Sequence, residues 1–319
     1  MNAKFRIGFI LDPIEKLVIG DDTSLLFIKE CERRGHQVFY IHQEDIFWDN
    51  GKPMVNLNYT EFDDQFNFLK GERKTEPLKS LDAVLIRLEP PYDLNYIYIT
   101  QILQLIGGRT FILNDPRGLR DANEKLYPLQ FSKFIPRTIV TKDINLLKNF
   151  LKEAGKIIIK QLNLYASKEL VLLSSKEKDV YPIFERLTQS KTRYVMAQEF
   201  LSKVYKTGDK RVVVLSGEVL GYYSRIPRKN DFRSDPDFGG INKKTVLTKK
   251  EKEICRVVSK KLLEDGIYFA GIDMIGERLT EINVTCPAGI IPINKLYGMR
   301  LEEKIIDFVE KKIMERISL

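Results

Sequence analysis

The sequence contains little cysteine and histidine and no long apolar run. Its three cysteines, Cys31, Cys255 and Cys286, are odd in number and far apart, which is not the pattern of a disulfide framework or of a paired zinc motif. No apolar stretch approaches the roughly 20 residues of a membrane-spanning helix. The first residues show no secretory signal. We therefore expect a reducing compartment, the cytoplasm, and no membrane partner.

Three common signature sequences are also missing. The chain has no G-x-x-x-x-G-K-[ST] sequence, no G-x-G-x-x-G sequence and no H-E-x-x-H sequence. A nucleotide or metal site would therefore have to be built from residues that are dispersed along the chain.

The composition is that of a folded protein with a positive net charge. The chain has 319 residues, of which 43% are hydrophobic and 30% are charged, enough for two or three globular units. The excess of 52 Lys and Arg over 44 Asp and Glu fits either nucleic acid or a cleft for anionic ligands. The most basic stretch, 243–252, carries no groove-reading motif. We expect it to be a solvated helix face, and we expect no nucleic-acid partner.

The first third of the chain has the pattern of an open α/β layer. Residues 6–11 form an apolar run of strand length, residues 24–34 have helical spacing, and residues 37–41 resemble a second strand. Further elements follow: a hairpin turn at Asp49-Asn50-Gly51, strands at 83–86 and 110–113, and a helix at 94–106. We expect this part to fold as α/β.

The rest of the chain alternates shorter units and predicts α+β lobes. Helices are expected at 143–154, 179–187, 249–264 and 301–317, and strands at 156–160, 170–173, 194–199, 211–215, 219–226, 268–275 and 279–284. The polar stretch 227–244 is long for a connection and is typical of a functional lid or a disordered segment. The predicted division is an N-terminal domain (1–122), a small lobe (123–202) and a large lobe (203–319).

Oxygen ligands cluster on the last two predicted strands before the final helix. Glu281 and Asn283 are two residues apart, so both face the same side of a strand. Asp273 joins them if the hairpin pairs it with Glu281, which we expect through a three-residue loop, Gly276-Glu277-Arg278. Such hard ligands suit magnesium that also contacts a phosphate. Polar residues at a strand end without any metal are the commoner explanation of such a pattern taken alone.

Two lysines are candidates for phosphate contacts. Lys160 ends the apolar run Ile157-Ile158-Ile159, so a strand would deliver its ammonium group to the edge of a cleft. Lys125 is the second candidate. Taken singly, each lysine is more often a surface residue whose stem lies along apolar neighbours.

A set of ordered motifs resembles bacterial glutathione synthetase over nearly the whole chain. These motifs are Phe9-Ile10-Leu11-Asp12-Pro13-Ile14, Arg87 with Glu89-Pro90-Pro91-Tyr92-Asp93, Asn123-Glu124-Lys125-Leu126, Ala197-Gln198-Glu199-Phe200-Leu201, Gly208-Asp209-Lys210-Arg211, Arg225-Ile226-Pro227 and Glu281-Ile282-Asn283-Val284-Thr285. Their shared order and spacing is far more specific than any single motif.

The resemblance implies the ATP-grasp fold, with two α+β lobes that clamp ATP behind an N-terminal α/β domain. It implies a ligase of glutathione biosynthesis that joins γ-glutamylcysteine to glycine through an acyl phosphate and releases ADP and phosphate. It further implies Mg²⁺ as the cofactor, with Mn²⁺ as an alternative. A homo-oligomer, commonly a tetramer, is the expected assembly.

The same resemblance implies roles for thirteen residues. Lys125 and Lys160 would contact ATP phosphates, and Asp209 would approach the ribose. Gln198 and the backbone of Glu199, Phe200 and Leu201 would hold the adenine. Asp273, Glu281 and Asn283 would bind magnesium, and Arg211, Arg225 and Arg233 would face the reacting carboxylate and the peptide substrate, where a planar guanidinium fixes orientation well.

Two segments depart from the family pattern. Residues 163–169 contain no glycine, although the family has a glycine-rich segment there whose backbone N–H groups approach the phosphates closely. Ser167 and Lys168 would have to replace some of these amides. Ser234-Asp235 follows Arg233 where the family usually has glycine and asparagine. Three functions stay open: glutathione synthetase, a related ligase with another acid or amine, and a non-catalytic ATP- or peptide-binding relative.

Overall fold

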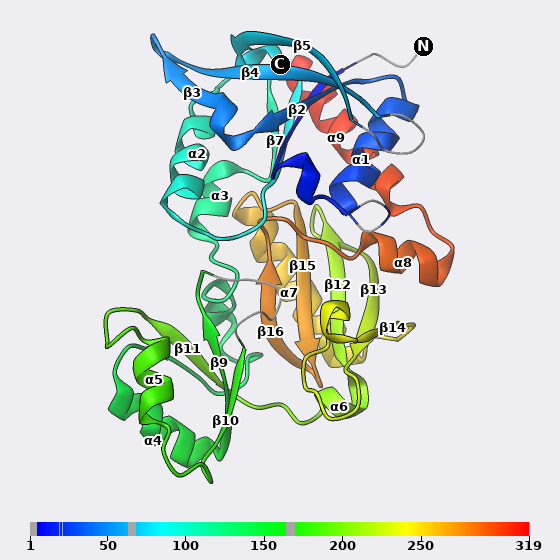
Figure 1. Ribbon diagram of the computed structural model, residues 1–319. Coiled ribbons are helices and arrows are strands. Elements are labelled where there is room, and N and C mark those ends of the chain that lie inside the picture. Colours follow the sequence, from blue (N-terminus) through cyan, green and yellow to red (C-terminus); the bar gives the residue numbers. More distant parts are fainter. Residues whose placement is uncertain (1–4, 19, 21, 63–67, 164–169, 319) are drawn as a thin grey trace.

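The computed structural model describes residues 5–18, 20, 22–62, 68–163 and 170–318, and its strands form three separate sheets (Figure 1). The N-terminal sheet has the order β3-β4-β2-β1-β6-β7, with β5 paired to β4. Its strands are β1 (Arg6–Leu11), β2 (Gln37–His42), β3 (Ile46–Asp49), β4 (Lys52–Phe62), β5 (Phe68–Pro77), β6 (Ala83–Arg87) and β7 (Phe111–Leu113). The centre of this sheet is parallel.

Helices cover both faces of the N-terminal sheet, which explains the unbroken apolar run of β1. Ile7, Phe9 and Leu11 pack with α1 (Thr23–Arg33) and α9 (Leu301–Ile317). Ile10 faces the opposite side, with α2 (Leu94–Gln104) and α3 (Pro116–Asp121). The last helix of the chain therefore packs against the first sheet.

The second sheet is antiparallel, with the order β10-β9-β11-β8. Its elements are β8 (Thr138–Thr141), β9 (Lys156–Gln161), β10 (Val171–Ser174) and β11 (Val195–Glu199), with α4 (Ile144–Ala154) and α5 (Tyr181–Leu187) on one face. The buried side chains of α4, α5, β9 and β11 form a core of their own. The other face is left for the site described below.

The third sheet is antiparallel, with the order β14-β13-β12-β15-β16. Its strands are β12 (Asp209–Leu215), β13 (Glu218–Ile226), β14 (Ile241–Lys243), β15 (Phe269–Ile275) and β16 (Arg278–Asn283), and its helices are α6 (Val204–Thr207), α7 (Lys249–Glu264) and α8 (Ile290–Tyr297). Short 3-10 turns complete the described chain at η1 (Ile14–Lys16), η2 (Gln43–Asp45), η3 (Leu78–Ser80), η4 (Tyr127–Phe131) and η5 (Pro236–Phe238).

Most predicted elements are confirmed, and the differences have local causes. The turn at Asn50-Gly51 joins β3 to β4 with positive φ at both residues, 44° and 85°. The long hairpin of β4 and β5, the short helix α3 and the helix α8 were not predicted. The stretch 227–244 is not an unstructured connection, because η5 and β14 lie within it. Within the described residues, no helix is both long and apolar enough to cross a bilayer.

The side chain of Asn114 docks the N-terminal sheet onto the third sheet. Its amide nitrogen donates to the carbonyls of Phe269 and Val284, and its oxygen accepts from the N–H groups of Tyr268 and Phe269, at 2.8 to 3.2 Å. Asn114 is 4% exposed, so water cannot replace these bonds.

We predict that Asn114→Ala lowers the free energy of unfolding by about 3 kcal/mol, because buried backbone groups lose their partners. Urea denaturation would measure this loss. Asn56→Ala is the control, since Asn56 accepts one bond from Thr75 at an exposed position, and it should cost less than about 0.5 kcal/mol. Equal losses in the two variants would contradict the docking role.

Candidate functional site

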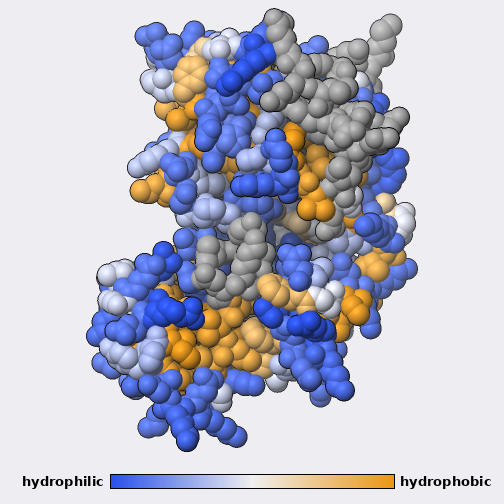
Figure 2. Space-filling model, viewed as in Figure 1, coloured by the Kyte–Doolittle hydropathy of each residue, from blue (hydrophilic) through white to orange (hydrophobic). Residues whose placement is uncertain are grey.

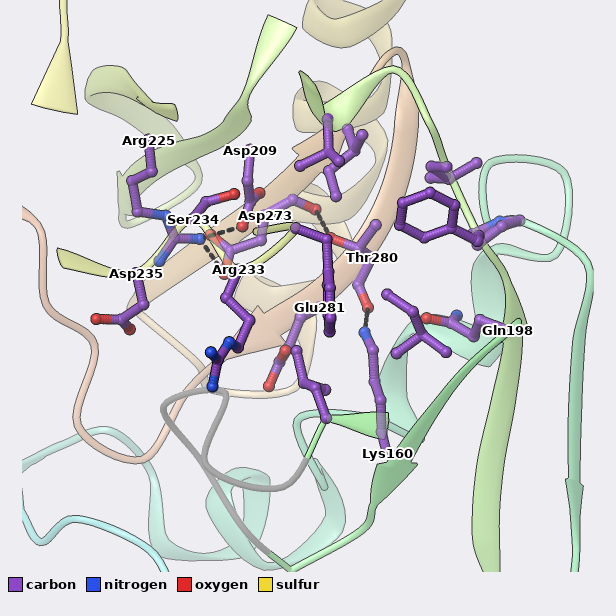
Figure 3. A pocket seen from close by; sticks show the side chains of 18 of the residues that line it. Lys160, Gln198, Asp209, Arg225, Arg233, Ser234, Asp235, Asp273, Thr280 and Glu281 are labelled. Carbon is purple, nitrogen blue, oxygen red and sulfur yellow. Dashed lines mark hydrogen bonds and ion pairs between the residues drawn. The ribbon is translucent and has the colours of Figure 1, made fainter. Parts of the chain in front are cut away.

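The candidate site is a pocket between the second and third sheets. In Figure 2 apolar side chains gather where the parts of the chain that carry these two sheets meet, in the lower half of the view. Figure 3 shows the charged groups that converge in the pocket. Twelve of the thirteen predicted residues line this pocket: Lys160, Gln198, Glu199, Phe200, Leu201, Asp209, Arg211, Arg225, Arg233, Asp273, Glu281 and Asn283. The thirteenth, Lys125, reaches the pocket through an ion pair with Glu281.

The hairpin of β15 and β16 places the predicted metal ligands together. Asp273 pairs with Glu281, and Asn283 pairs with Gly271, so the predicted register is confirmed. The predicted three-residue loop is wrong. The turn has two residues, Gly276 and Glu277, with φ of 54° and 67°, and an irregularity after Asp273 supplies the offset.

Cross-strand pairing brings two arginines to the same face of the third sheet. Asp209 and Arg211 alternate along β12, so both side chains lie on one side. Asp209 is opposite Arg225 on β13, and Arg211 is opposite Asp273 on β15. The four charged groups are therefore direct neighbours because of the strand register. Lys210, between them, faces the other way and pairs with Glu251 of α7 at 2.7 Å.

Asp273 is held between two guanidinium groups. Arg211 makes a fork, with Nε 2.5 Å from Oδ1 and Nη2 2.9 Å from Oδ2. Arg225 places Nη2 3.0 Å from Oδ2 of Asp273 and 2.5 Å from Oδ2 of Asp209. The amide nitrogen of Asn283 donates to the same Asp273 oxygen at 3.1 Å. Figure 3 shows Arg225 pointing between the two aspartates.

Gly271 leaves the space that Arg211 needs. A methyl group at Gly271 would lie 3.1 Å from Cδ of Arg211 and 3.3 Å from its Nε. These contacts are shorter than ordinary packing distances. The absence of a side chain at Gly271 thus lets Arg211 lie flat across β15 to reach Asp273.

The pKa values of the two buried aspartates are shifted in opposite directions. Burial opposes the charge on Asp273, but Arg211 and Arg225 outweigh it and hold the pKa of this carboxyl well below its usual value. For Asp209 burial dominates and raises the pKa to about 6, with Arg225 opposing. Oδ1 of Asp209 and Nε of Arg225 are buried and have no hydrogen-bond partner within the part of the chain that the structure describes. Each is therefore ready to bind a polar group of a ligand.

Two lysines reach the pocket from different parts of the chain. Lys125 places Nζ 3.3 Å from Oε1 of Glu281, and Lys160 on β9 donates to the carbonyl of Thr280 at 3.0 Å (Figure 3). Burial lowers the pKa of Lys160, with Glu281 opposing this effect. Burial also opposes the charge on Glu281, but Lys125 and Lys160 outweigh it and lower its pKa.

The segment that follows β11 forms the edge of the pocket. Glu199 and Phe200 donate their N–H groups to the carbonyls of Arg137 and Lys156, so these two amides are already used. Among the described residues, the N–H of Leu201 makes no such backbone bond. Phe200 also meets Phe232 edge to face, at 6.2 Å and 90° between the rings, which closes the apolar side of the pocket.

Arg233 lies at the rim of the pocket, on the loop between β13 and β14. Its guanidinium makes a fork with Asp231 and stacks on the ring of Phe238, 3.9 Å from the centroid. Ser234, one of the departures from the family pattern, is buried in this loop. A side chain on Gly240 would meet the Ser234 carbonyl oxygen at 2.0 Å, so this loop conformation requires glycine there.

The donors at this hairpin fit a divalent cation. Asp273, Glu281 and the amide of Asn283 offer hard oxygen ligands beside four cationic groups, Lys125, Lys160, Arg211 and Arg225. Two carboxylates are fewer than a protein-only site needs, and the described residues contain no group of three His, Cys, Asp or Glu suited to a metal. The set therefore fits an ion that takes its other ligands from phosphate or water, as Mg²⁺ does.

Some site residues were missed, and some predictions lie outside the described residues. Ile158 lines the pocket two residues before Lys160, and strand alternation could have identified it. Phe232 carried no such signal because it lies on a loop. The predicted replacement of loop amides by Ser167 and Lys168 falls within 164–169, which the structure does not describe.

Comparisons with known proteins agree along the whole chain. Residues 5–120 match the family described as prokaryotic glutathione synthetase, N-terminal domain, and residues 124–298 match prokaryotic glutathione synthetase, ATP-grasp domain. The glutathione synthetase of Synechocystis sp. is 36% identical over 96% of this chain and 99% of its own length. That of Gloeobacter violaceus is 38% identical over 95% and 96%.

Solved structures with low identity share the fold. D-cycloserine synthetase DcsG has a TM-score of 0.68 at 12% identity, covering 95% of this chain and 99% of that chain. D-alanyl-alanine synthetase A from Vibrio cholerae has a TM-score of 0.64 at 14% identity, covering 98% and 99%. At these identities the likeness concerns the fold alone.

We predict that Arg211 and Asp273 are energetically coupled. Arg211→Met should lower the free energy of unfolding by about 3 kcal/mol, because a buried carboxylate loses its two-point partner. Asp273→Asn should then cost about 1 to 3 kcal/mol less in the Arg211→Met background than alone. Urea denaturation of the wild type, both single variants and the double variant measures the coupling. Losses that add to within about 0.5 kcal/mol would show that the pair does not act as a unit.

Proposed function

The chain belongs to the prokaryotic glutathione synthetase family, and on this premise we propose that it joins γ-glutamylcysteine to glycine, using the thirteen residues of the pocket in the roles that their positions suit. It is an ATP-dependent carboxylate–amine ligase with the ATP-grasp fold, in a family that uses ATP and a divalent metal. The observation that carries the proposal is the convergence of four cations and the Asp273–Glu281 pair in one pocket between two lobes.

The lysines and the edge segment suit the nucleotide. Lys125 and Lys160 would bind the phosphates, because their ammonium groups already lie beside the carboxylate Glu281 and the carbonyl of Thr280. The N–H of Leu201 suits a ring nitrogen of adenine, with Gln198, Glu199 and Phe200 around it. The unpartnered Oδ1 of Asp209 suits a ribose hydroxyl.

Mg²⁺ is the ion that we propose, with Mn²⁺ as a substitute. Asp273, Glu281 and Asn283 would hold it, and it would neutralise charge on the transferring phosphoryl group. In the described state Asn283 turns its nitrogen toward Asp273. Its amide would therefore have to rotate for the oxygen to face a cation.

The arginines suit the acid substrate and the two charged species of the reaction. Phosphoryl transfer to the acid carboxylate gives an acyl phosphate, and attack by the amine gives a tetrahedral oxyanion that expels phosphate. Both species carry negative charge beside Arg211 and Arg225, whose fixed donors stabilise it. Arg233, at the rim, would hold the remote part of the peptide.

The ion pairs of Asp273 suggest an exchange of partners. Arg211 cannot give its fork to a substrate carboxylate while it is committed to Asp273. A divalent ion on Asp273 would replace the arginine as counter-charge and release it toward the substrate. Metal binding and acid binding would then favour each other, as linkage requires.

The division into units at 1–122, 123–202 and 203–319 is also part of the proposal. It is supported by the three sheets, because each one lies within a single unit. We further propose a cytoplasmic homo-oligomer, with a tetramer as the assembly. Free thiols at Cys31, Cys255 and Cys286 suit a reducing compartment. Exposed apolar side chains on α2 and β3, with Leu94 63% and Trp48 48% exposed, suit a subunit interface.

We predict ADP release that requires γ-glutamylcysteine, glycine and Mg²⁺ together. Glu281→Gln should lower this turnover by about 100-fold, because it removes a carboxylate ligand of the metal ion that neutralises charge on the transferring phosphoryl group. Glu277→Gln is the matched control, since Glu277 is in the turn of the same hairpin and bonds Thr248 outside the pocket. A coupled assay of ADP with a panel of acids and amines measures both.

The outcomes of this assay separate the three functions. Faster turnover of another acid or amine than of γ-glutamylcysteine and glycine would show that the protein is a related ligase and not a glutathione synthetase. Nucleotide binding without ADP release from any pair would show a non-catalytic relative. Equal effects of Glu281→Gln and Glu277→Gln would remove the metal role from Glu281.

We predict that Mg-ADP tightens the binding of γ-glutamylcysteine at least about tenfold compared with ADP alone, since the ion frees Arg211. Isothermal calorimetry measures the two affinities. Asp273→Asn should bind the dipeptide without metal more tightly than the wild type does. Asp235 lines the same pocket and makes no ion pair with Arg211 among the described residues, so Asp235→Asn should leave the metal-free affinity for the dipeptide unchanged. Equal affinities with and without Mg²⁺ would contradict the exchange.

A further inference from the structure

The segment Asn123–Lys125 touches three parts of the molecule with three consecutive side chains. Nδ2 of Asn123 donates to the carbonyl of Leu162 at 2.9 Å, just beyond the end of β9. Lys125 pairs with Glu281 on β16. Glu124, between them, binds the chain that leaves β16. The segment also connects the N-terminal domain to η4, so it lies where all three units meet.

The carboxylate of Glu124 is an acceptor for three donors. Its Oε1 accepts from the N–H of Val284 at 2.8 Å, the N–H of Thr285 at 3.1 Å and Oγ1 of Thr285 at 2.9 Å. Its backbone carbonyl accepts from the N–H of Ile282 at 3.2 Å. The backbone of Glu124 therefore bonds the residue before Asn283, and its side chain bonds the two residues after it.

These bonds of Glu124 help to place Lys125 beside Glu281, which comes from a different part of the chain. Glu281 and Asn283 are placed by their own strand, but Lys125 lies on a connecting segment that is not part of any strand. The bonds of Glu124 to 282–285 tie that segment to the strand. These bonds hold the backbone next to Lys125 beside β16, where Nζ of Lys125 lies 3.3 Å from Oε1 of Glu281.

A role in anchoring the segment alone does not explain why a carboxylate is buried at Glu124. The residue is 8% exposed, and burial raises its pKa, with the neighbouring Glu281 adding to the shift and Lys125 opposing it. A buried acid near another acid is a costly way to anchor a loop, and buried charges are weak evidence for stability. Their best use is to hold neighbouring groups in one geometry.

We propose that Glu124 is a positioning residue of the ligase, which holds Lys125 against Glu281 and holds Asn283 in place, so that the phosphate-binding and metal-binding groups form one site. The proposal rests on the proposed function. Glu124 contacts neither nucleotide nor substrate in this role. It acts through Lys125, which would bind phosphate, and through Glu281 and Asn283, which would bind the metal ion.

The test compares Glu124→Ala, Glu124→Gln and Tyr127→Phe in the full chain. Tyr127 is the matched control. It lies two residues after Lys125, at the start of η4, and its hydroxyl bonds Asp265 at 2.7 Å, away from the pocket. Calorimetry measures Mn²⁺ binding in the presence of ADP, steady-state kinetics give KM for ATP and kcat separately, and thermal melting reports stability.

Glu124→Ala should weaken Mn²⁺ binding and raise KM for ATP by about 10- to 100-fold, the usual effect of losing a residue that orients metal ligands. Glu124→Gln should recover most of both, because its amide oxygen can accept the same three bonds. Tyr127→Phe should lower the melting temperature and leave Mn²⁺ affinity and KM unchanged.

The proposal would be overturned if Glu124→Ala shifts only the melting temperature, as Tyr127→Phe does, or if Glu124→Gln is as impaired as Glu124→Ala. Should Glu124→Ala fail to fold, Thr285→Val removes one of the three bonds and should weaken Mn²⁺ binding by a smaller factor; no change would also overturn the proposal. Mn²⁺ affinity is measured without acid or amine, so a wrong substrate assignment would appear as an inactive wild type and leave this readout intact.

Discussion

The site depends on the buried carboxylate of Asp273, held between two guanidinium groups. Two unit charges 4 Å apart attract by about 4 kcal/mol at an effective dielectric constant of 20. Asp273 has two such partners and is 5% exposed. Removing one partner from a buried pair typically costs about 3 to 5 kcal/mol, because the remaining charge is left unpaired. The charges around Asp273 therefore stabilise one another, and a ligand that binds Asp273 or the fork of Arg211 must replace a partner.

This constraint explains why the site needs more than one unit of the chain. The third sheet supplies Asp273 and both arginines, but the second sheet supplies Lys160 and the edge segment, and the connecting segment supplies Lys125. Preorganised charges in a buried site act on a reacting phosphoryl group without the reorganisation that water requires.

The sequence predicted most of this arrangement because two kinds of information were local. The spacing of Glu281 and Asn283, and the turn that follows Asp273, determined which side chains share a face of the hairpin. The bulge could not be predicted, because a two-residue turn with a bulge and a three-residue loop give the same Asp273–Glu281 pairing. The partners of Asp273 were also not predicted, since the Arg211 and Arg225 contacts follow from sheet order, which sequence pattern does not contain. Helix α8 was missed because Gly289, at its start with φ of 121°, and Pro292 within it are signals of a break in a helix.

The position of a bound divalent ion would test the role of Asp273 most directly. A crystal structure with Mn²⁺ and a non-hydrolysable ATP analogue would locate the ion by its anomalous scattering. We expect one peak within about 2.2 Å of a carboxylate oxygen of both Asp273 and Glu281, with the fork between Arg211 and Asp273 opened. A structure in which nucleotide is bound, the fork is intact and no ion contacts Asp273 would contradict the central claim.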